Sequence, residues 1–196
     1  GRLEQGIQAP GSATILQNYE PAVQGGYSKI LGYQKFSSTL VPSTGIVTSV
    51  IALGTSEVLA FRGSNWYYST GAGWTSKGVA ALSPVVSVYS DRFNFDGTTK
   101  TVIVDGVNAP SFFDHSAKTL TYSTTTNTDV IGATNVKVFK NHVFYAKNNL
   151  LTFSSPYREN DFSAGLGSGT INIGETITGL VVFRDELIIF CLNSRS

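Results

Sequence analysis

Three regularly spaced aspartates and two histidines are the residues of this chain that could support acid–base or metal chemistry. Asp96, Asp105 and Asp114 recur every nine residues, His115 follows the last of them, and His142 comes 27 residues later. Paired carboxylates can hydrolyse glycosidic bonds, and histidines bind metals or act as general bases. However, two of the aspartates precede a glycine and follow an apolar run, as is typical of hairpin turns. We therefore interpret these aspartates as turn residues.

The sequence around the two histidines does not indicate a catalytic or metal site. His142 follows an expected tight turn, so we interpret it, like His115, as a solvated or hydrogen-bonding residue. No Gly-x-Ser-x-Gly motif supports a Ser-His-Asp triad, and the aspartate spacing does not match a calcium loop. The single cysteine, Cys191, excludes an internal disulfide and a Cys-rich zinc site, and we expect it to be buried in an apolar strand. We expect no enzymatic activity, no metal and no cofactor.

A cluster of aromatic residues is the remaining candidate for ligand binding. The segment Tyr67–Trp74 is similar to the Asp-box of sialidase-type propellers, but Thr70 or Gly71 stands where the box has its aspartate. The aromatic residues of this region could form a platform for a sugar, although such residues more often pack between sheets. We favour packing between sheets for Trp66, Tyr67, Tyr68 and Trp74.

The composition predicts strands joined by many turns. The 196 residues include 20 glycines and 43 serines and threonines, and 12% of the residues are aromatic. Charged residues make up 14% of the chain, against about 25% in an average globular protein, and the net charge is +1. This balance gives no electrostatic reason for tight non-specific binding to nucleic acid or to a membrane surface. The longest apolar stretches are also too short for a membrane span of about 20 residues.

Short apolar runs separated by turn residues predict four sets of strands from Gly45 onward. In each set an apolar segment, a short polar turn and a second apolar segment follow one another. The last apolar residues before the four turns, Leu53, Tyr89, Phe139 and Phe183, are 36, 50 and 44 residues apart. The expected strands are Ile46–Ala52, Val58–Arg62, Asn65–Ser69, Val85–Ser90, Arg92–Asp96, Thr101–Asp105, Ser111–Asp114, Thr119–Ser123, Val136–Lys140, His142–Ala146, Leu150–Ser154, Thr170–Gly174, Ile177–Phe183 and Leu187–Cys191.

This repeat favours an all-β fold of four-stranded, propeller-like blades. Propeller blades recur every 40–50 residues or so and bury their faces against each other. The innermost strand of a blade should then be covered on both faces, which Leu180–Phe183 fits by composition. A β-sandwich is the alternative. We expect an irregular N-terminal arm over residues 1–42 and a partial propeller over 43–196, of about three blades and the start of another. Because Ile177–Cys191 supplies only one hairpin, we expect further strands or another chain to cover it.

The beginning of the chain resembles a family of structural proteins from the tails of bacteriophages. The resemblance lies in Asn18-Tyr19-Glu20-Pro21, Gly25-Gly26-Tyr27-Ser28-Lys29-Ile30 and Gly32-Tyr33-Gln34-Lys35-Phe36, which match an opening motif that precedes propeller blades in that family. The later segment Val182–Phe190 resembles the blade strands of the same proteins. The resemblance implies a virion component, made in the cytoplasm of the bacterial host, and it carries over no catalytic residues.

The resemblance also implies partners. They would be neighbouring copies in a homo-oligomeric nozzle or hub ring, the adaptor or portal-proximal ring of the tail, and DNA in transit through the channel. We hypothesise that Tyr19, Tyr27, Tyr33 and Phe36 anchor the arm to a partner or to its own propeller, because interfaces favour aromatic residues. The alternative function is a carbohydrate-binding or glycosidase-type propeller, for example a receptor-binding tail protein. A secreted bacterial propeller scaffold is a third possibility, which the lack of a secretory signal makes less favourable.

Overall fold

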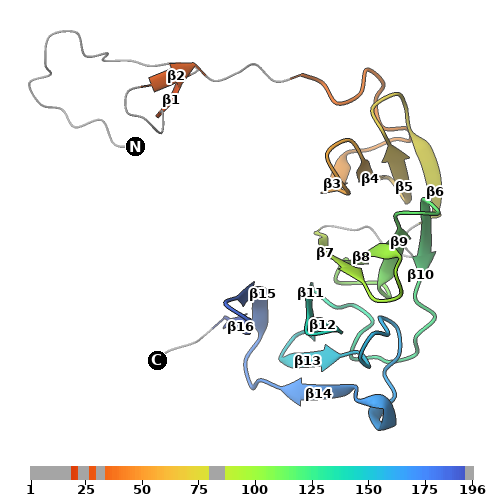
Figure 1. Ribbon diagram of the computed structural model, residues 1–196. Coiled ribbons are helices and arrows are strands. Elements are labelled where there is room, and N and C mark those ends of the chain that lie inside the picture. Colours follow the sequence, from red (N-terminus) through yellow and green to blue (C-terminus); the bar gives the residue numbers. More distant parts are fainter. Residues whose placement is uncertain (1–18, 22–26, 30–33, 80–86, 193–196) are drawn as a thin grey trace, which may run out of the picture. The chain divides into compact units, whose positions relative to one another are not determined.

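The computed structural model describes residues 19–21, 27–29, 34–79 and 87–192, and they form an all-β protein (Figure 1). This confirms the predicted fold class. The chain divides into two compact units, Gly1–Phe36 and Ser37–Ser196. In the first unit, β1 (Tyr19–Pro21) pairs antiparallel with β2 (Tyr27–Lys29), so that Tyr19 lies opposite Lys29 and Pro21 opposite Tyr27.

The second unit contains three four-stranded antiparallel sheets and one two-stranded sheet. In every sheet, strands that are consecutive in the sequence are hydrogen-bonded neighbours. The first sheet is β3 (Val47–Ala52), β4 (Val58–Arg62), β5 (Asn65–Ser69) and β6 (Thr75–Val79). The second is β7 (Tyr89–Asn94), β8 (Thr99–Val104), β9 (Ser111–Asp114) and β10 (Thr119–Tyr122). The third is β11 (Asn135–Phe139), β12 (His142–Lys147), β13 (Leu150–Phe153) and β14 (Gly169–Asn172), with the short 3-10 helix η1 (Ala164–Leu166) before β14.

The two-stranded sheet is a hairpin of β15 (Ile177–Phe183) and β16 (Glu186–Cys191). The first strands of the four sheets begin at residues 47, 89, 135 and 177, which are 42, 46 and 42 residues apart. The structural repeat is therefore more regular than the spacing estimated from the sequence, because the turn expected after Tyr89 is not a turn. One strand, β7, runs through Ser90 and Asp91, and the hairpin turn follows at Asp96-Gly97, where Gly97 has φ +83°.

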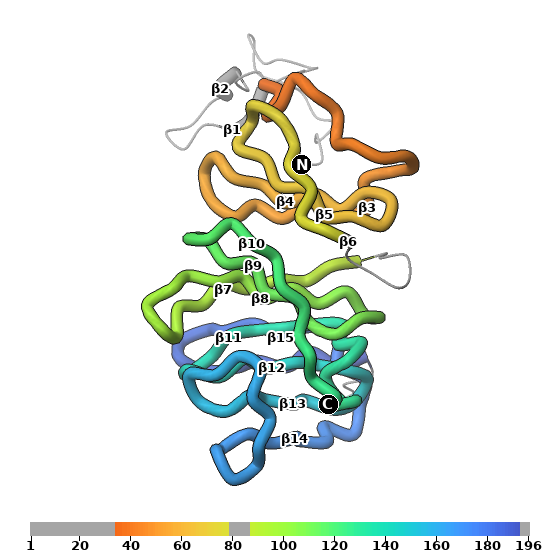
Figure 2. The backbone as a smooth tube through the Cα atoms, turned by 90° about the vertical axis from the view of Figure 1, so that its right-hand side faces the viewer, coloured from red at the N-terminus to blue at the C-terminus, as the bar shows by residue number. Residues whose placement is uncertain are grey.

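Successive sheets are stacked face to face (Figure 2). Three apolar cores lie between them. The core between the first and second sheets includes Phe61 and Trp66 from one side and Ile103 and Phe113 from the other. The core between the second and third sheets includes Phe93, Val102, Phe112, Val136 and Tyr145. The third core joins Ala146 and Leu151 of the third sheet to Ile177, Leu180, Leu187 and Ile189 of the hairpin.

Packing on both faces of the second sheet excludes a two-layer β-sandwich. Strand β8 shows this most clearly, because four consecutive residues, Thr101–Val104, are buried. Side chains alternate between the two faces of a strand, so Val102 faces the third sheet and Ile103 faces the first. Propeller blades are expected to contact a neighbouring sheet on each face, as the second sheet does. Closure of the sheets into a propeller stays a prediction.

The prediction that Leu180–Phe183 is buried on both faces is wrong. Leu180–Phe183 was expected to be covered on both faces, yet Val181 and Phe183 of β15 are about half exposed. The well-buried strands are instead the middle ones, such as β8 and β12, which pair on both edges. β15 and β16 have a sheet packed against only one face among the described residues. Exposed and partly buried side chains therefore alternate along β16, and Val181, Val182 and Phe183 at the end of β15 are all exposed.

Residues 37–45 are tied to the first sheet. The Arg62 guanidinium donates hydrogen bonds to the carbonyl oxygens of Val41 and Gly45, the latter at 2.8 Å, and the Trp74 indole N–H donates to the carbonyl oxygen of Thr39 at 3.1 Å. These bonds explain why the compact unit begins at Ser37, whereas the sequence placed the end of the arm after residue 42.

One further strand differs from the strand predictions. Strand β6 was missed because its sequence, Thr-Ser-Lys-Gly-Val, has no apolar alternation, as is usual for a solvent-facing edge strand. The segment Val85–Ser90 falls partly outside the described residues. The short gaps between the expected strands His142–Ala146 and Leu150–Ser154, and between Ile177–Phe183 and Leu187–Cys191, contain hairpin turns, as expected. Asn148, Arg184 and Asp185 in these turns have positive φ values, which are typical of primed hairpin turns.

Candidate interaction surfaces

The three aspartates are turn residues, as predicted. The Asp96 carboxylate accepts a hydrogen bond from the Thr98 N–H at 3.0 Å, and the other two each accept bonds from two backbone N–H groups just downstream. Each carboxylate thereby satisfies the donors of its own turn. Each aspartate therefore has a local role in its own turn, and the nine-residue spacing of the three aspartates does not require a shared catalytic centre.

Both histidines hydrogen-bond within the sheets. The His142 Nδ1 lies 2.6 Å from the carbonyl oxygen of Ser154, and the His115 Nε2 lies 2.8 Å from the Thr101 hydroxyl. Partial burial lowers the pKa of His115, and the nearby Arg92 charge lowers it further, so its ring is neutral at neutral pH. No three His, Cys, Asp or Glu side chains gather into a metal-binding group in the part of the chain that the structure describes. Cys191 is half-buried against the third core, not fully buried as expected.

The aromatic residues near Trp66 pack mainly between sheets, as predicted. Trp66 is buried against Phe61, with ring centroids 5.2 Å apart, and Tyr68 stacks on Phe113 of the second sheet at 5.6 Å. Tyr67 is also buried. Trp74 is half-buried and its N–H is bonded to Thr39, so these four residues do not form an open platform for a sugar.

The four proposed anchor residues are described only in part. Tyr19 and Tyr27 begin β1 and β2, and Tyr33 lies outside the described residues. Phe36 is 42% exposed at the end of the first unit. Their role as anchors stays a prediction.

Ion pairs link each sheet to the next, in addition to the apolar cores. Between the first and second sheets, the Glu57 carboxylate accepts hydrogen bonds from Lys118 and, at 2.7 Å, from the Tyr68 hydroxyl. Between the third sheet and the hairpin, Lys140 lies 3.2 Å from Asp185 at the surface. An exposed pair of this kind contributes at most about 1 kcal/mol, so the cores dominate the stability.

The second and third sheets are linked most strongly. The Asp91 carboxylate on β7 accepts a hydrogen bond from the Val138 N–H at 2.8 Å and pairs with Lys137 at 3.0 Å. Lys100 adds a second link, because it pairs with Glu159 at 2.8 Å and also with Asp96. A polar residue within β7 thus makes a specific contact with the next sheet, which explains why the sequence suggested a turn there.

The Glu57 link makes stability depend on pH. The hydrogen bonds from Lys118 and Tyr68 hold the pKa of Glu57 below its ordinary value of 4.5. A lowered carboxylate pKa stabilises the fold above the unfolded-state pKa, and this contribution is lost as the pH falls below about 4.5. We expect Glu57→Gln to have a lower urea midpoint of unfolding than the wild type at about pH 7. Near pH 3, the gap between the two midpoints should be smaller. Equal differences at both pH values would contradict the role of Glu57.

An apolar surface is exposed on the outer face of the β15–β16 hairpin. The register places Val181 opposite Ile188 and Gly179 opposite Phe190, so these side chains share a face with Phe183, away from Leu180 and Ile189 in the third core. Their exposed fractions are 47% for Val181, 55% for Phe183, 36% for Ile188 and 51% for Phe190. We call these four residues the hairpin face.

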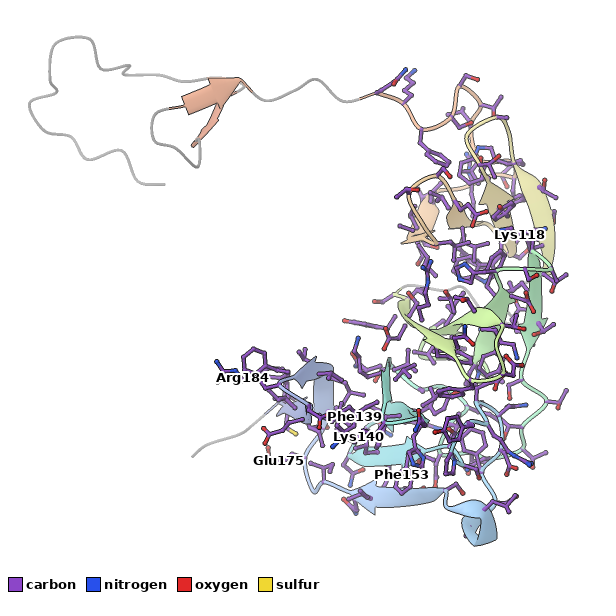
Figure 3. All side chains as sticks on the ribbon, in the orientation of Figure 1. Lys118, Phe139, Lys140, Phe153, Glu175 and Arg184 are labelled. Carbon is purple, nitrogen blue, oxygen red and sulfur yellow. The ribbon has the colours of Figure 1, made fainter. Side chains whose placement is uncertain are left out.

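Charged residues lie around the hairpin (Figure 3). The Arg184 guanidinium lies over the Phe183 ring at 5.2 Å, and Lys140 lies over Phe139 at 5.0 Å. An apolar centre with a charged rim is typical of protein–protein interfaces. The sequence predicts that this hairpin is uncovered, but it does not identify the outer residues, because the face that each strand residue occupies depends on the pairing register.

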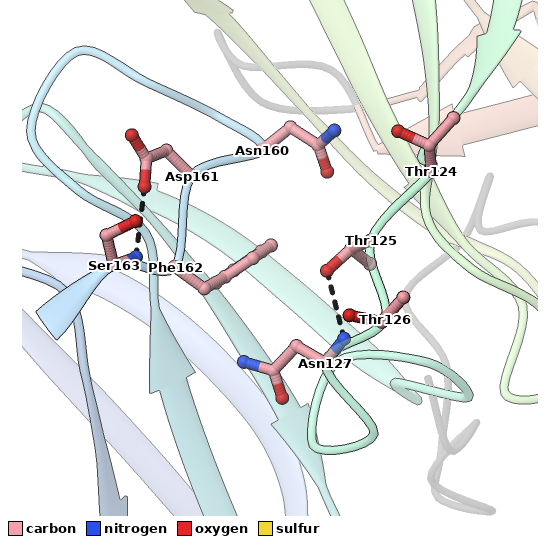
Figure 4. Close-up of a pocket in the computed structure, with 8 residues that line it drawn as sticks. All are labelled: Thr124, Thr125, Thr126, Asn127, Asn160, Asp161, Phe162 and Ser163. Carbon is pink, nitrogen blue, oxygen red and sulfur yellow. Dashed lines mark hydrogen bonds between the residues drawn. The ribbon is translucent and has the colours of Figure 1, made fainter.

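A polar pocket of about 600 Å³ lies between two loops that are distant in the sequence (Figure 4). One loop joins β10 to β11 and the other joins β13 to η1. The Ser123 hydroxyl links them by donating to the Asn160 side-chain oxygen. The pocket is lined by Thr124, Thr125, Thr126, Asn127, Asn160, Asp161, Phe162 and Ser163. This pocket was not predicted from the sequence, because no local motif marks two polar loops that meet only in the fold.

No helix among the described residues is both long enough and apolar enough to cross a membrane. Comparisons with protein-family models, curated proteins and solved structures gave no match for this chain.

Proposed function

We propose that this chain is a non-enzymatic structural component of a bacteriophage tail, part of a nozzle or hub ring. The proposal rests first on the opening motif that resembles tail proteins. It is supported by the stack of sheets, which apolar cores and ion pairs tie together at each of the three junctions. Such a stack is a rigid spacer that presents loops and faces to neighbouring subunits.

The observation that carries the proposal furthest is the hairpin face. Its four apolar side chains form one continuous row on a sheet, and exposed apolar patches of this kind mark interaction sites. The corresponding faces of the first and second sheets pack onto the next sheet along the chain. In the assembled tail, the hairpin face packs against a sheet of the adjoining subunit, while the low net charge limits retention of DNA in the channel.

Changing the hairpin face tests this function. The double variant Phe183→Ser and Phe190→Ser should reduce ring assembly, measured by native mass spectrometry of the purified chain, with little change in thermal stability. Leu166→Ser is the matched control, since Leu166 is a similarly exposed apolar residue on η1. Assembly that is equal in the double variant, the control and the wild type would contradict the role of the hairpin face.

Two further measurements address the arm and the location. Removing residues 1–36 should abolish ring assembly if the aromatic residues of the arm are anchors.

Antibodies against residues 37–196 should label the tails of virions of the encoding phage in electron micrographs. Labelling confined to other parts of the virion, or absent from it, would contradict the tail assignment.

A further inference from the structure

The pocket between the β10–β11 and β13–η1 loops has features of a ligand site that a scaffold does not require. It is a hollow open to solvent, and its volume of about 600 Å³ falls within the range of small-molecule sites, about 300–1,000 Å³. Its lining consists of hydroxyl and amide side chains with a single aromatic ring, that of Phe162. Figure 4 shows the Phe162 side chain extending between the two loops, toward Thr125.

The first loop is held in shape by alternate side chains. The Ser123 hydroxyl accepts from the Thr125 N–H, Thr125 accepts from the Asn127 N–H, and Asn127 accepts from the Asp129 N–H, at 2.9–3.1 Å. The intervening Thr124 and Thr126 are exposed and line the pocket. Because these two hydroxyls are not used to shape the loop, they can hydrogen-bond a ligand without loss of the loop conformation.

The second loop is held equally firmly. Asp161 accepts a hydrogen bond from the Ser163 N–H at 2.9 Å, and its own carbonyl oxygen accepts from the Ser155 N–H at 2.8 Å. The Asn160 oxygen accepts from Ser123, so the orientation of its amide is fixed and the amide N–H₂ is left to donate. Phe162 packs edge-on against the buried Tyr145 ring at 5.7 Å, which fixes the ring that extends between the loops.

The charge of the pocket selects among ligand classes. The backbone N–H of Ser163 lowers the pKa of Asp161, so this carboxylate is ionised at neutral pH, and it pairs with the Arg158 guanidinium at 3.4 Å. This ion pair is close to neutral, so it offers no net positive charge for a phosphate or another anion. One carboxylate is too few for a dedicated calcium site, which takes six to eight oxygen ligands. A neutral ligand with many hydroxyl groups matches the hydroxyl, amide and carboxylate lining, and its C–H groups match the Phe162 ring.

From this lining we infer that the pocket binds a neutral saccharide, of the size of a monosaccharide or a disaccharide. Thr124, Thr126, Asn160 and Asp161 hydrogen-bond its hydroxyl groups, and Phe162 contacts its apolar face. This activity is independent of the structural role proposed above, because the pocket and the hairpin face share no residue.

Titrations followed by NMR amide shifts test this inference on the full chain. The probes are glucose, galactose, mannose, N-acetylglucosamine, lactose and maltose, with inorganic phosphate as the anionic comparison. We expect saturable shifts at residues 124–127 and 160–163 with at least one sugar. The double variant Thr124→Val and Thr126→Val should weaken that binding by about tenfold or more, since two hydrogen bonds are lost.

The control is Thr119→Val, which removes an exposed threonine hydroxyl on β10 outside the pocket and should leave the affinity unchanged. Asn160→Ala should also weaken binding, and the unchanged amide spectrum of the sheets would show that it folds. Absence of saturable shifts with all six sugars, shifts that map elsewhere, preferential binding of phosphate, or full affinity in the double threonine variant would each overturn the inference.

Discussion

Replacing Tyr145 by alanine is expected to lower the free energy of unfolding by about 3–5 kcal/mol. The Tyr145 side chain on β12 is fully buried in the core between the second and third sheets. Its hydroxyl donates a hydrogen bond to the Glu159 carbonyl oxygen at 2.9 Å, and its ring packs against Phe162. Alanine leaves a cavity that the two sheets cannot close, because both are held in register by Asp91 and Lys100.

The matched control for this cavity is Tyr145→Phe. It keeps the ring and removes only the hydroxyl, so its cost should be about 1 kcal/mol. Because burial raises the pKa of Tyr145, its hydroxyl stays protonated, and the difference between the wild type and Tyr145→Phe should not change with pH near neutrality. Chemical denaturation followed by fluorescence measures both free energies. Equal destabilisation by alanine and phenylalanine would show that the hydrogen bond, not the packing, is the main contribution.

Phe113→Ala should produce the second large loss, again about 3–5 kcal/mol. Phe113 on β9 is fully buried, stacks on Tyr68 at 5.6 Å and contacts the edge of His115 at 5.4 Å. It belongs to the core between the first and second sheets. Its neighbour Phe112 belongs to the core on the opposite face, so the substitution should loosen one junction and leave the other intact.

Hydrogen exchange distinguishes this local effect from general unfolding. In Phe113→Ala, amides of β3–β5 should exchange faster, while those of β12 and β13 should keep their protection. Phe113→Leu is the control, with an expected cost below about 1.5 kcal/mol because most of the volume is kept. Equal acceleration in all three four-stranded sheets would mean that the sheets unfold as one unit and that the junction is not a separate element of stability.

The sequence was sufficient to predict most strands, because apolar runs and turn residues act locally. Val58–Arg62, Asn65–Ser69, Ser111–Asp114 and Ile177–Phe183 were predicted with the bounds that the structure shows. The turns at Asn148 and Arg184-Asp185 were predicted for the same reason, since few residues tolerate positive φ and asparagine and aspartate are among them.

The interaction surfaces could not be predicted, because they depend on which segments meet in space. The polar Ser90-Asp91 pair indicated a turn, yet Asp91 is a strand residue whose carboxylate bonds to a backbone N–H 47 positions away. The pocket is a similar case, since Ser123 and Asn160 are 37 residues apart and only the packing of the third sheet brings their loops together. Local patterns contain no information about such pairings.

The pairing of each strand with its chain neighbours has a consequence for biosynthesis. Every four-stranded sheet of the second unit is assembled from one continuous stretch of roughly 30 to 40 residues, so all its hydrogen-bonded partners have left the ribosome once that stretch has emerged. A newly made sheet can therefore serve as the template on which the following one condenses. The polypeptide can acquire its structure in the order in which it is translated, and only the segment emerging last contains strands that still lack their hydrogen-bonded partners.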